Sequence, residues 1–292
     1  MIVITTPTGH VGSKVLEKIL KTDEKIKVVA RDPSKLSKEV QEKVEIIEGS
    51  LDNFETVSKA YKGADQLFLI IPPSMRYTNV NDYYMQFARP SCEAIKKQGV
   101  KRVVYISGTG LGHEKNAGPV SASYLVEKML EATGAAIRIL HCGSFMENLL
   151  HSVQSIKFTS QHSGAVQTNI KYPWVATQDI AAAAVKLLLD KTWTGNGSLG
   201  VLGPEDLSYG DITKMMSDVL GKEIRYQQIP DEELKAILIN YGATEAAAQG
   251  LIDIYNSVNK EVFNLVPRSL ESSSPTSFRS WCEEIFKPAV LK

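Results

Sequence analysis

The sequence predicts an α/β protein in which helices flank a parallel sheet and a smaller, mainly helical C-terminal lobe follows. Short apolar runs alternate with amphipathic stretches through the first half of the chain, which is typical of successive strand–helix units. After Gly143 this alternation stops, and amphipathic stretches predominate beyond Pro204. A glycine-containing loop follows the first apolar run, which indicates a parallel sheet of the Rossmann type.

Each predicted element rests on an apolar run or on a helical period. Strands are expected at residues 1–5, 26–30, 44–48, 66–71, 102–107 and 136–141, with one more strand of the main sheet at 199–202. Helices are expected at residues 11–20, 53–61, 83–97, 121–132 and 177–190, and in the lobe at 209–220, 231–241, 244–258 and 275–286. Asp231 and Thr244 stand where N-caps belong, and Gly134 where a C-cap belongs.

Composition excludes several classes of protein. The 292 residues include 33 Lys+Arg and 33 Asp+Glu, so no excess charge attracts nucleic acid or anionic lipid, and direct nucleic-acid binding is not expected. The longest apolar stretch, Leu67 to Ile71, is too short to cross a bilayer, and the charged start does not fit a signal peptide. Scattered cysteines at 92, 142 and 282 predict no metal site and a reduced, cytoplasmic setting.

The segment Thr-Thr-Pro-Thr-Gly-His-Val-Gly at residues 5–12 joins the first strand to the first helix. A helix N-terminus offers unpaired N–H groups to a pyrophosphate, Gly9 would admit the phosphates, and Gly12 would let helix and strand pack closely. A full glycine motif would have glycine at Thr6, and Pro7 removes one backbone donor. A tight turn without a ligand is the alternative. The expected cofactor contacts in this loop are Thr6, Thr8, Gly9, His10, Val11 and Gly12.

The end of the second strand indicates which dinucleotide binds. An enzyme that uses NAD places Asp or Glu there to hold the ribose 2′-hydroxyl, whereas this chain has Ala30 followed by Arg31. Arg31 could bind a 2′-phosphate through two hydrogen bonds, and Lys35 could add charge. We therefore expect NADP, with NADPH preferred over NADH. In the alternative interpretation both cations are solvated and Asp32 opposes the signal. Ile71, Pro72 and Ser107, at later strand ends, complete the expected cofactor contacts.

Together these residues resemble the NmrA-like family of atypical short-chain dehydrogenases/reductases. The likeness extends to Glu127–Gly134, Ile137–Leu140, Gly143–Asn148 and Asp179–Ala183. The resemblance implies an NADP(H)-binding Rossmann domain at 1–145 with 172–204, and a substrate-binding lobe at 146–171 with 205–292. A small-molecule substrate would then lie in a cleft between them. Family members include quinone, dye and imine reductases and non-catalytic redox sensors.

Tyr124 and Lys128 have the spacing of the Tyr-x-x-x-Lys pair of short-chain dehydrogenases, with Ser107 as the usual third member. The register argues against this catalytic triad. In the related enzymes the run that begins here at Glu127 starts four residues after the lysine, which puts the lysine position at Ser123 and the tyrosine position at Pro119. Tyr124 and Lys128 are then one residue late, a rotation of about 100° around the helix. Both interpretations stay open.

Other residues could line a substrate site. His113 in the glycine-rich loop 108–118 could reach the nicotinamide, and Phe145, Met146 and Asn148 could form an apolar wall. A solvated histidine and ordinary core packing are the alternatives. The favoured function is an NADPH-dependent reductase of a quinone, imine or dye-like acceptor. A redox sensor acting through a protein partner is the second hypothesis, and a sugar-nucleotide epimerase fits poorly because its chemistry needs the tyrosine.

Overall fold

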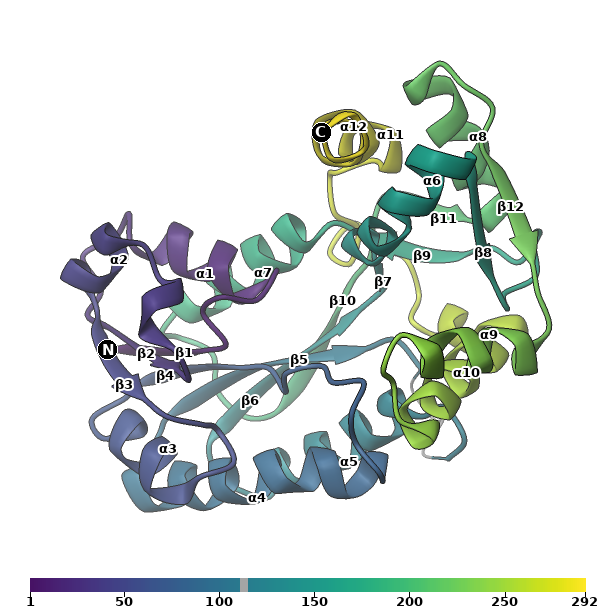
Figure 1. Cartoon of the computed structure of the whole chain (residues 1–292). Coiled ribbons are helices and arrows are strands. Elements are labelled where there is room, and N and C mark those ends of the chain that lie inside the picture. The colour runs from purple at the N-terminus through teal and green to yellow at the C-terminus, as the bar shows by residue number, and fades with distance from the viewer. Residues whose placement is uncertain (111–114) are drawn as a thin grey trace.

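The computed structural model describes residues 1–110 and 115–292, and its centre is a seven-stranded parallel sheet (Figure 1). The order across the sheet is β10-β6-β5-β4-β1-β2-β3, so the direction of winding reverses between β1 and β4. Open α/β sheets bind ligands at the carboxyl ends of the strands beside such a reversal. The strands are β1 Ile2–Thr5, β2 Ile26–Ala30, β3 Glu45–Glu48, β4 Gln66–Leu69, β5 Arg102–Gly108, β6 Ala136–Cys142 and β10 Gly197–Val201.

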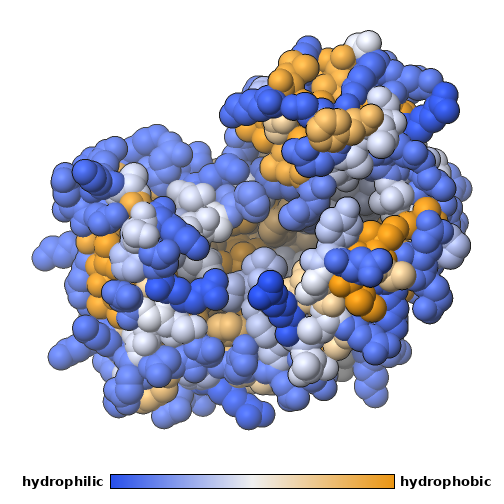
Figure 2. Space-filling model, in the orientation of Figure 1, coloured by the Kyte–Doolittle hydropathy of each residue, from blue (hydrophilic) through white to orange (hydrophobic). Residues whose placement is uncertain are grey.

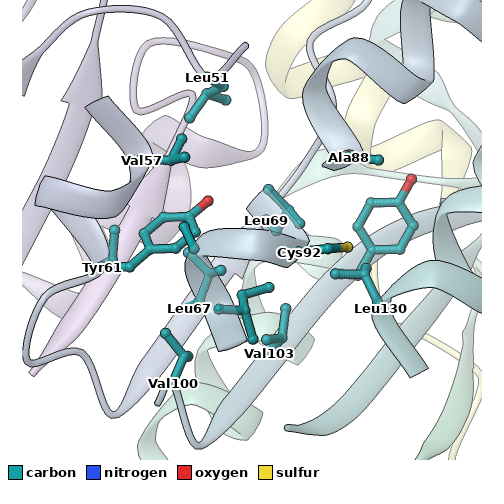
Figure 3. Close-up of a cluster of buried hydrophobic side chains, with 14 of the residues drawn as sticks. Leu51, Val57, Tyr61, Leu67, Leu69, Ala88, Cys92, Val100, Val103 and Leu130 are labelled. Carbon is teal, nitrogen blue, oxygen red and sulfur yellow. The ribbon is translucent and has the colours of Figure 1, made fainter. Parts of the chain in front are cut away.

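Helices cover both faces of this sheet (Figure 1). One face carries α1 Gly12–Ile19 and α7 Thr177–Leu189, which pack on each other. The other carries α3 Phe54–Tyr61, α4 Val80–Gln98 and α5 Pro119–Glu131. Figure 3 shows the apolar cluster on this second face, which includes Val57, Leu69 and Cys92 together with the buried ring of Tyr61. Burial of both faces explains why the strands are continuous apolar runs rather than alternating ones.

The lobe lies beyond the carboxyl ends of the strands and has its own apolar cluster, centred on Trp174, Phe278 and Trp281 (Figure 1). It contains one sheet of β7 Ser144–Phe145, β9 Tyr172–Val175 and β11 Asp206–Leu207, and another of β8 Gln161–Gly164 and β12 Arg225–Gln228. Its main helices are α6 Val153–Thr159, α8 Tyr209–Leu220, α9 Asp231–Asn240, α10 Glu245–Asn259, α11 Phe278–Trp281 and α12 Lys287–Leu291. Short helices join these and the other elements: η1 Pro33–Lys35, α2 Lys38–Lys43, η2 Met146–Ser152, η3 Val262–Leu265 and the π-helical η4 Cys282–Phe286.

The predicted fold class is confirmed, and all seven strands expected in the main sheet are present, including the late strand β10. Thr244 caps α10 by accepting the N–H of Ala247 at 3.2 Å. Asp231 is not an N-cap, because it is the first helical residue of α9 and follows Pro230. The predicted helix 275–286 begins later, at Phe278, because Ser277 caps it. The small lobe strands were missed because two to four residues are too few to show a period.

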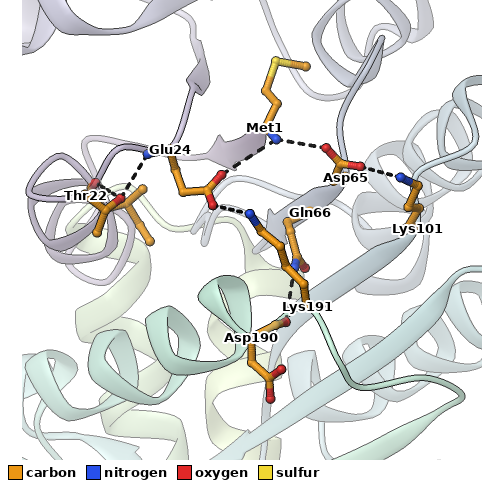
Figure 4. A network of polar contacts seen from close by, with 9 residues as sticks. Met1, Thr22, Glu24, Asp65, Gln66, Lys101, Asp190 and Lys191 are labelled. Atoms are coloured by element: carbon orange, nitrogen blue, oxygen red, sulfur yellow. Dashed lines mark hydrogen bonds and ion pairs between the residues drawn. The ribbon is translucent and has the colours of Figure 1, made fainter.

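At the amino ends of the strands, ion pairs hold neighbouring chain segments together (Figure 4). The N-terminal ammonium donates to Asp65 at 3.0 Å, and Lys101 Nζ donates to the same carboxylate at 2.7 Å. Lys191 pairs with Glu24 at 2.5 Å. Lys101 and the terminus lower the pKa of Asp65 to about 2. These groups lie at the opposite end of the sheet from the expected ligand site, so we assign them a role in stabilising the fold.

No helix among the described residues has both the length and the apolar character needed to cross a membrane.

Candidate cofactor and active site

The loop between β1 and α1 has the geometry of a phosphate-binding turn. Thr6 has φ 49°, the left-handed conformation that glycine favours, at the position where a glycine was expected. The N–H of Gly9 donates to the carbonyl of Thr6 at 3.0 Å and closes the turn. A side chain at Gly12 would place Cβ 2.2 Å from that carbonyl, so only glycine lets the helix pack here. Thr8, Gly9 and His10 are exposed, whereas Val11 is buried.

Two observations test whether this loop fits a dinucleotide. Helix α1 starts at Gly12 without a side-chain cap, although the N–H of Ser13 already donates to the carbonyl of Gly9 at 3.0 Å, so an anion would use the other N–H groups of the first turn. The hydroxyl of Thr6 is buried and has no hydrogen-bond partner among the described residues. A buried polar group without a partner is costly, and a phosphate or ribose oxygen would satisfy it. The loop therefore fits a dinucleotide.

The hydroxyl of Thr5 fixes the strand end beside this loop. It donates to the carbonyl of Phe68 at 3.0 Å and accepts the N–H of Ile70 at 3.2 Å, so it joins β1 to the chain leaving β4. The next residue, Ile71, is buried, and the carbonyl of Pro72 accepts a hydrogen bond from the hydroxyl of Tyr83 at 2.8 Å. The sequence analysis did not predict these hydrogen bonds of Thr5, because it identified Thr5 only as the last residue of the first strand and the start of the loop.

The end of β2 is open and positively charged. Ala30 is buried, Arg31 is exposed, and no hydrogen bond or ion pair of Arg31 is found within the described part of the chain. Asp32, the next residue, places a negative charge beside Arg31 in the chain, and its carboxylate accepts the N–H and the hydroxyl of Ser34 at 3.1 and 2.6 Å. These hydrogen bonds lower the pKa of Asp32. Lys35 Nζ lies 4.0 Å from Asp32 Oδ2.

A surface cleft of about 520 Å³ runs between α1 and the segment from η1 to α2. Thr8, Ser13, Lys35, Ser37 and Lys43 are among its lining residues, whereas Arg31 is not. Of the two cations expected to bind the 2′-phosphate, Lys35 is the one that lines this cleft together with Thr8 of the glycine loop.

At the carboxyl ends of β5 and β6, buried polar side chains form one connected network. The hydroxyls of Tyr105 and Ser107 lie 2.8 and 3.0 Å from Ser123 Oγ. Ser107 also donates to Glu127 Oε1 at 2.5 Å. His141, the residue opposite Ser107 on β6, places Nε2 at 3.2 Å from each oxygen of Glu127. The side chains of Ser107, Ser123, Glu127 and His141 are each less than a tenth exposed.

The network borders a narrow crevice lined by Ser107, Gly108, Gly110, Val120, Tyr124, Glu127 and His141. Thr109, beside it, has a buried hydroxyl without a partner in the described ranges. Glu127 served in the sequence only to set the register of the helix, and its chemical role was missed. The available signal was the helical spacing of Ser123 and Glu127, which places both on the face that meets the sheet.

Tyr124 and Lys128, the pair with the spacing of a short-chain dehydrogenase triad, contact each other in the structure. Tyr124 borders the same crevice as Ser107, so its side chain is less turned away than the register implied. No hydrogen bond joins Tyr124 to Ser107 among the described residues. Lys128 is 56% exposed, pairs with Glu131 at 3.1 Å, and lies 5.1 Å from the centre of the Tyr124 ring. Its ammonium therefore faces solvent rather than Ser107.

The residues expected to line a substrate wall are placed differently from one another. Asn148 is exposed, and Phe145 is partly buried against the sheet core. Met146 is 1% exposed and packs in the lobe core, so core packing accounts for it. His113 lies outside the described residues. Figure 2 shows the surface hollowed between the sheet domain and the lobe, with pale and orange side chains on the floor.

Two further contacts fix the lobe beside the site. Glu147, buried at the start of η2, accepts the N–H of Thr177 at 3.0 Å and lies 3.4 Å from Lys14 Nζ. Lys14 also donates to Thr177 Oγ1 at 2.6 Å, so one cation links α1, η2 and α7. On the other side, the N–H of Thr244 donates to the carbonyl of Met75 at 2.9 Å, which docks the hairpin of α9 and α10 on the loop after β4. No sequence pattern predicted these contacts.

The fold and the loop define a protein of the Rossmann dinucleotide-binding class. A model of the NmrA-like family matches residues 1–278, and the chain belongs to this family. An NAD(P)H azoreductase from Xenophilus azovorans is 27% identical over 257 residues, covering 87% of this chain and 86% of that protein.

Two solved structures share the fold over almost the whole chain. A nucleoside-diphosphate-sugar epimerase from Staphylococcus aureus superposes with TM-score 0.82 at 17% identity, covering 97% of this chain and 99% of that one. An NADPH-dependent quinone oxidoreductase from Escherichia coli, complexed with NADPH, superposes with TM-score 0.80 at 23% identity, covering 98% and 100%.

Proposed function

We propose that the protein is an NADPH-dependent oxidoreductase that passes hydride to a small, flat, unsaturated acceptor such as a quinone, an imine or an azo or aryl dye. The observation that carries the proposal is the glycine loop with its unsatisfied Thr6 hydroxyl, beside a β2 end that has Arg31 and no acid. The azoreductase and quinone oxidoreductase named above support it, since each is named for reduction of such an acceptor.

The β2 end supports NADPH over NADH. The 2′-hydroxyl of NADH would need an acceptor there, and Asp32, the first carboxylate after β2 in the chain, caps its own turn. A 2′-phosphate would instead gain a guanidinium that has no partner among the described residues, and charged hydrogen bonds of this kind are the strong ones. Lys35 would contribute less, because its ammonium already lies 4.0 Å from the Asp32 carboxylate.

Bound at this loop, NADPH would supply the hydride, and the acceptor would take one proton in the same turnover. Pyrophosphate would lie against the start of α1, adenosine toward β2, and the nicotinamide half therefore toward β4, β5 and β6. The side chains of this chain then position both reactants and exclude water. Ser107 is engaged by Glu127, and Lys128 faces solvent, so neither is arranged to deliver the proton.

NADPH oxidation against a panel of quinones, imines and azo dyes tests the proposal. We expect turnover with at least one class and a lower KM for NADPH than for NADH. Tight NADP(H) binding without turnover across the panel would contradict the reductase and favour a sensor that acts through a protein partner. Failure to bind either dinucleotide would reject both functions.

A further inference from the structure

We propose that Glu127 is a positioning residue that fixes the direction of the Ser107 hydroxyl, so that Ser107 presents a lone pair to the nicotinamide half of the cofactor. The inference rests on the proposed function, because it needs a dinucleotide on the glycine loop. Glu127 touches neither cofactor nor substrate in this account and acts only through Ser107.

The first step is the set of partners of Glu127. A carboxylate can only accept hydrogen bonds. Its Oε1 lies 2.5 Å from Ser107 Oγ, so the single hydroxyl proton of Ser107 points to Glu127. His141 Nε2 lies 3.2 Å from both carboxylate oxygens, so that nitrogen carries a proton as well. The carboxylate thus determines the orientation of two neighbouring donors.

The second step follows the chain of hydroxyls away from Glu127. Because the proton of Ser107 is used, the 3.0 Å contact between Ser107 and Ser123 requires Ser123 to donate. The proton of Ser123 is then used, so Tyr105 donates across the 2.8 Å contact to Ser123. Tyr105 is suited to this role, since burial raises its pKa well above the ordinary value and keeps the phenol protonated. Every proton in the row points toward Glu127.

The third step is what remains available at Ser107. A hydroxyl oxygen has two lone pairs, and Ser123 uses one. The other is left for a ligand at the crevice where Ser107 stands with Gly108, Gly110 and Tyr124; this crevice is too narrow to hold a water molecule, so the ligand group must widen it to reach Ser107. A ligand group that binds there must therefore donate an O–H or an N–H, as the ribose hydroxyls and the carboxamide of nicotinamide do. A quinone or ketone oxygen is an acceptor and gains nothing from Ser107.

This direction of hydrogen bonding is opposite to the one expected for Ser107 as a member of a catalytic triad. There the serine would donate to a substrate carbonyl and orient it. In this chain the buried carboxylate of Glu127 takes that proton, so Ser107 recognises the cofactor and not the oxygen of the acceptor.

Calorimetric titration with NADP⁺ and with 2′,5′-ADP, which lacks the nicotinamide half, tests the proposal. The variants are Ser107→Ala, Glu127→Met and the double variant, with Glu131→Met as a control one turn along the same helix. We expect each single variant to raise the Kd for NADP⁺ by about tenfold, the value of one hydrogen bond. The double variant should lose no more than Ser107→Ala alone, because Glu127 acts on the cofactor only through Ser107. Affinity for 2′,5′-ADP should stay within about twofold throughout.

Three results would overturn the proposal: an unchanged Kd for NADP⁺ in Ser107→Ala, multiplying losses in the double variant, or equal losses for NADP⁺ and 2′,5′-ADP. Ser107→Ala removes a single oxygen, so it remains informative if Glu127→Met does not fold. Failure of the wild-type protein to bind 2′,5′-ADP would instead reject the proposed function, which keeps the two failures distinct.

Discussion

At the carboxyl end of β2 the polar side chains are exposed, and Arg31 has no partner among the described residues, whereas at the ends of β5 and β6 the polar side chains are buried and joined to one another. At the β2 end, the exposed guanidinium of Arg31 can pair with a negatively charged group of a ligand. The β5 end offers hydroxyls whose directions are already fixed, at the cost of burying a carboxylate. This difference underlies our proposals that the β2 end would select between NADP(H) and NAD(H) and that the β5 end would orient the nicotinamide half.

The largest expected effect concerns the glycine loop, which lies between these two ends of the site. Gly9→Val should abolish dinucleotide binding, by at least about a thousandfold, because its side chain would occupy the place of a phosphate. The protein should stay folded, since a Cβ at Gly9 meets only the Thr6 carbonyl at 3.4 Å. Nicotinamide fluorescence measures dinucleotide binding, and circular dichroism checks that the variant is folded. Retained binding by a folded variant would place the pocket elsewhere.

Acidity limits the pH range in which the two ends can be compared. Burial lowers the pKa of His162, in the lobe, to about 4 from 6.5. As pH falls through 6.5 the unfolded chain takes up a proton that the folded chain refuses until about pH 4, so the free energy of unfolding should fall by about 3 kcal/mol across that interval. Urea unfolding of wild type and His162→Phe at several pH values checks this. Equal pH slopes would contradict it.

Arg31→Ala tests the exposed end. It should cost about 1.5–3 kcal/mol of NADP⁺ binding and leave NAD⁺ binding unchanged, because only the 2′-phosphate contact is lost. Lys35→Ala should cost less, and Arg225→Ala in the lobe, where the arginine pairs with Glu223, should cost nothing. Calorimetric titration measures all three. An Arg31→Ala variant that still prefers NADP⁺ would remove the assigned basis of cofactor choice.

The smallest expected effect concerns Tyr124, beside the buried end. Tyr124→Phe should change turnover by less than about threefold, because Ser107 is bonded to Glu127 and Lys128 is paired with Glu131, whereas loss of a true proton donor costs about 10²–10⁴-fold. Steady-state kinetics with Tyr241→Phe as an exposed control decides the matter. A hundredfold drop at unchanged cofactor affinity would restore Ser107, Tyr124 and Lys128 as a triad.

The sequence was informative where a function depends on neighbours in the chain. The glycine loop, Ala30 and Arg31 lie within short segments, so their patterns can be recognised locally. The apolar runs that predicted the main sheet are local patterns as well. It was uninformative where groups meet only after folding. Ser107, Glu127 and His141 come from β5, α5 and β6, and Lys14, Glu147 and Thr177 are separated by up to 163 residues.

Strand β10 reaches the sheet late in the chain, and this order affects how the protein can fold during synthesis. The edge beside β6 stays open until residues 197–201 have emerged from the ribosome, and α7, which covers one face, emerges only shortly before. By then residues 146–171, which contribute to the lobe core, are already outside. A nascent chain halted after Gly143 would expose an unpaired β6 edge and uncovered apolar strands. Such a chain is prone to aggregate and is the kind of chain that chaperones bind.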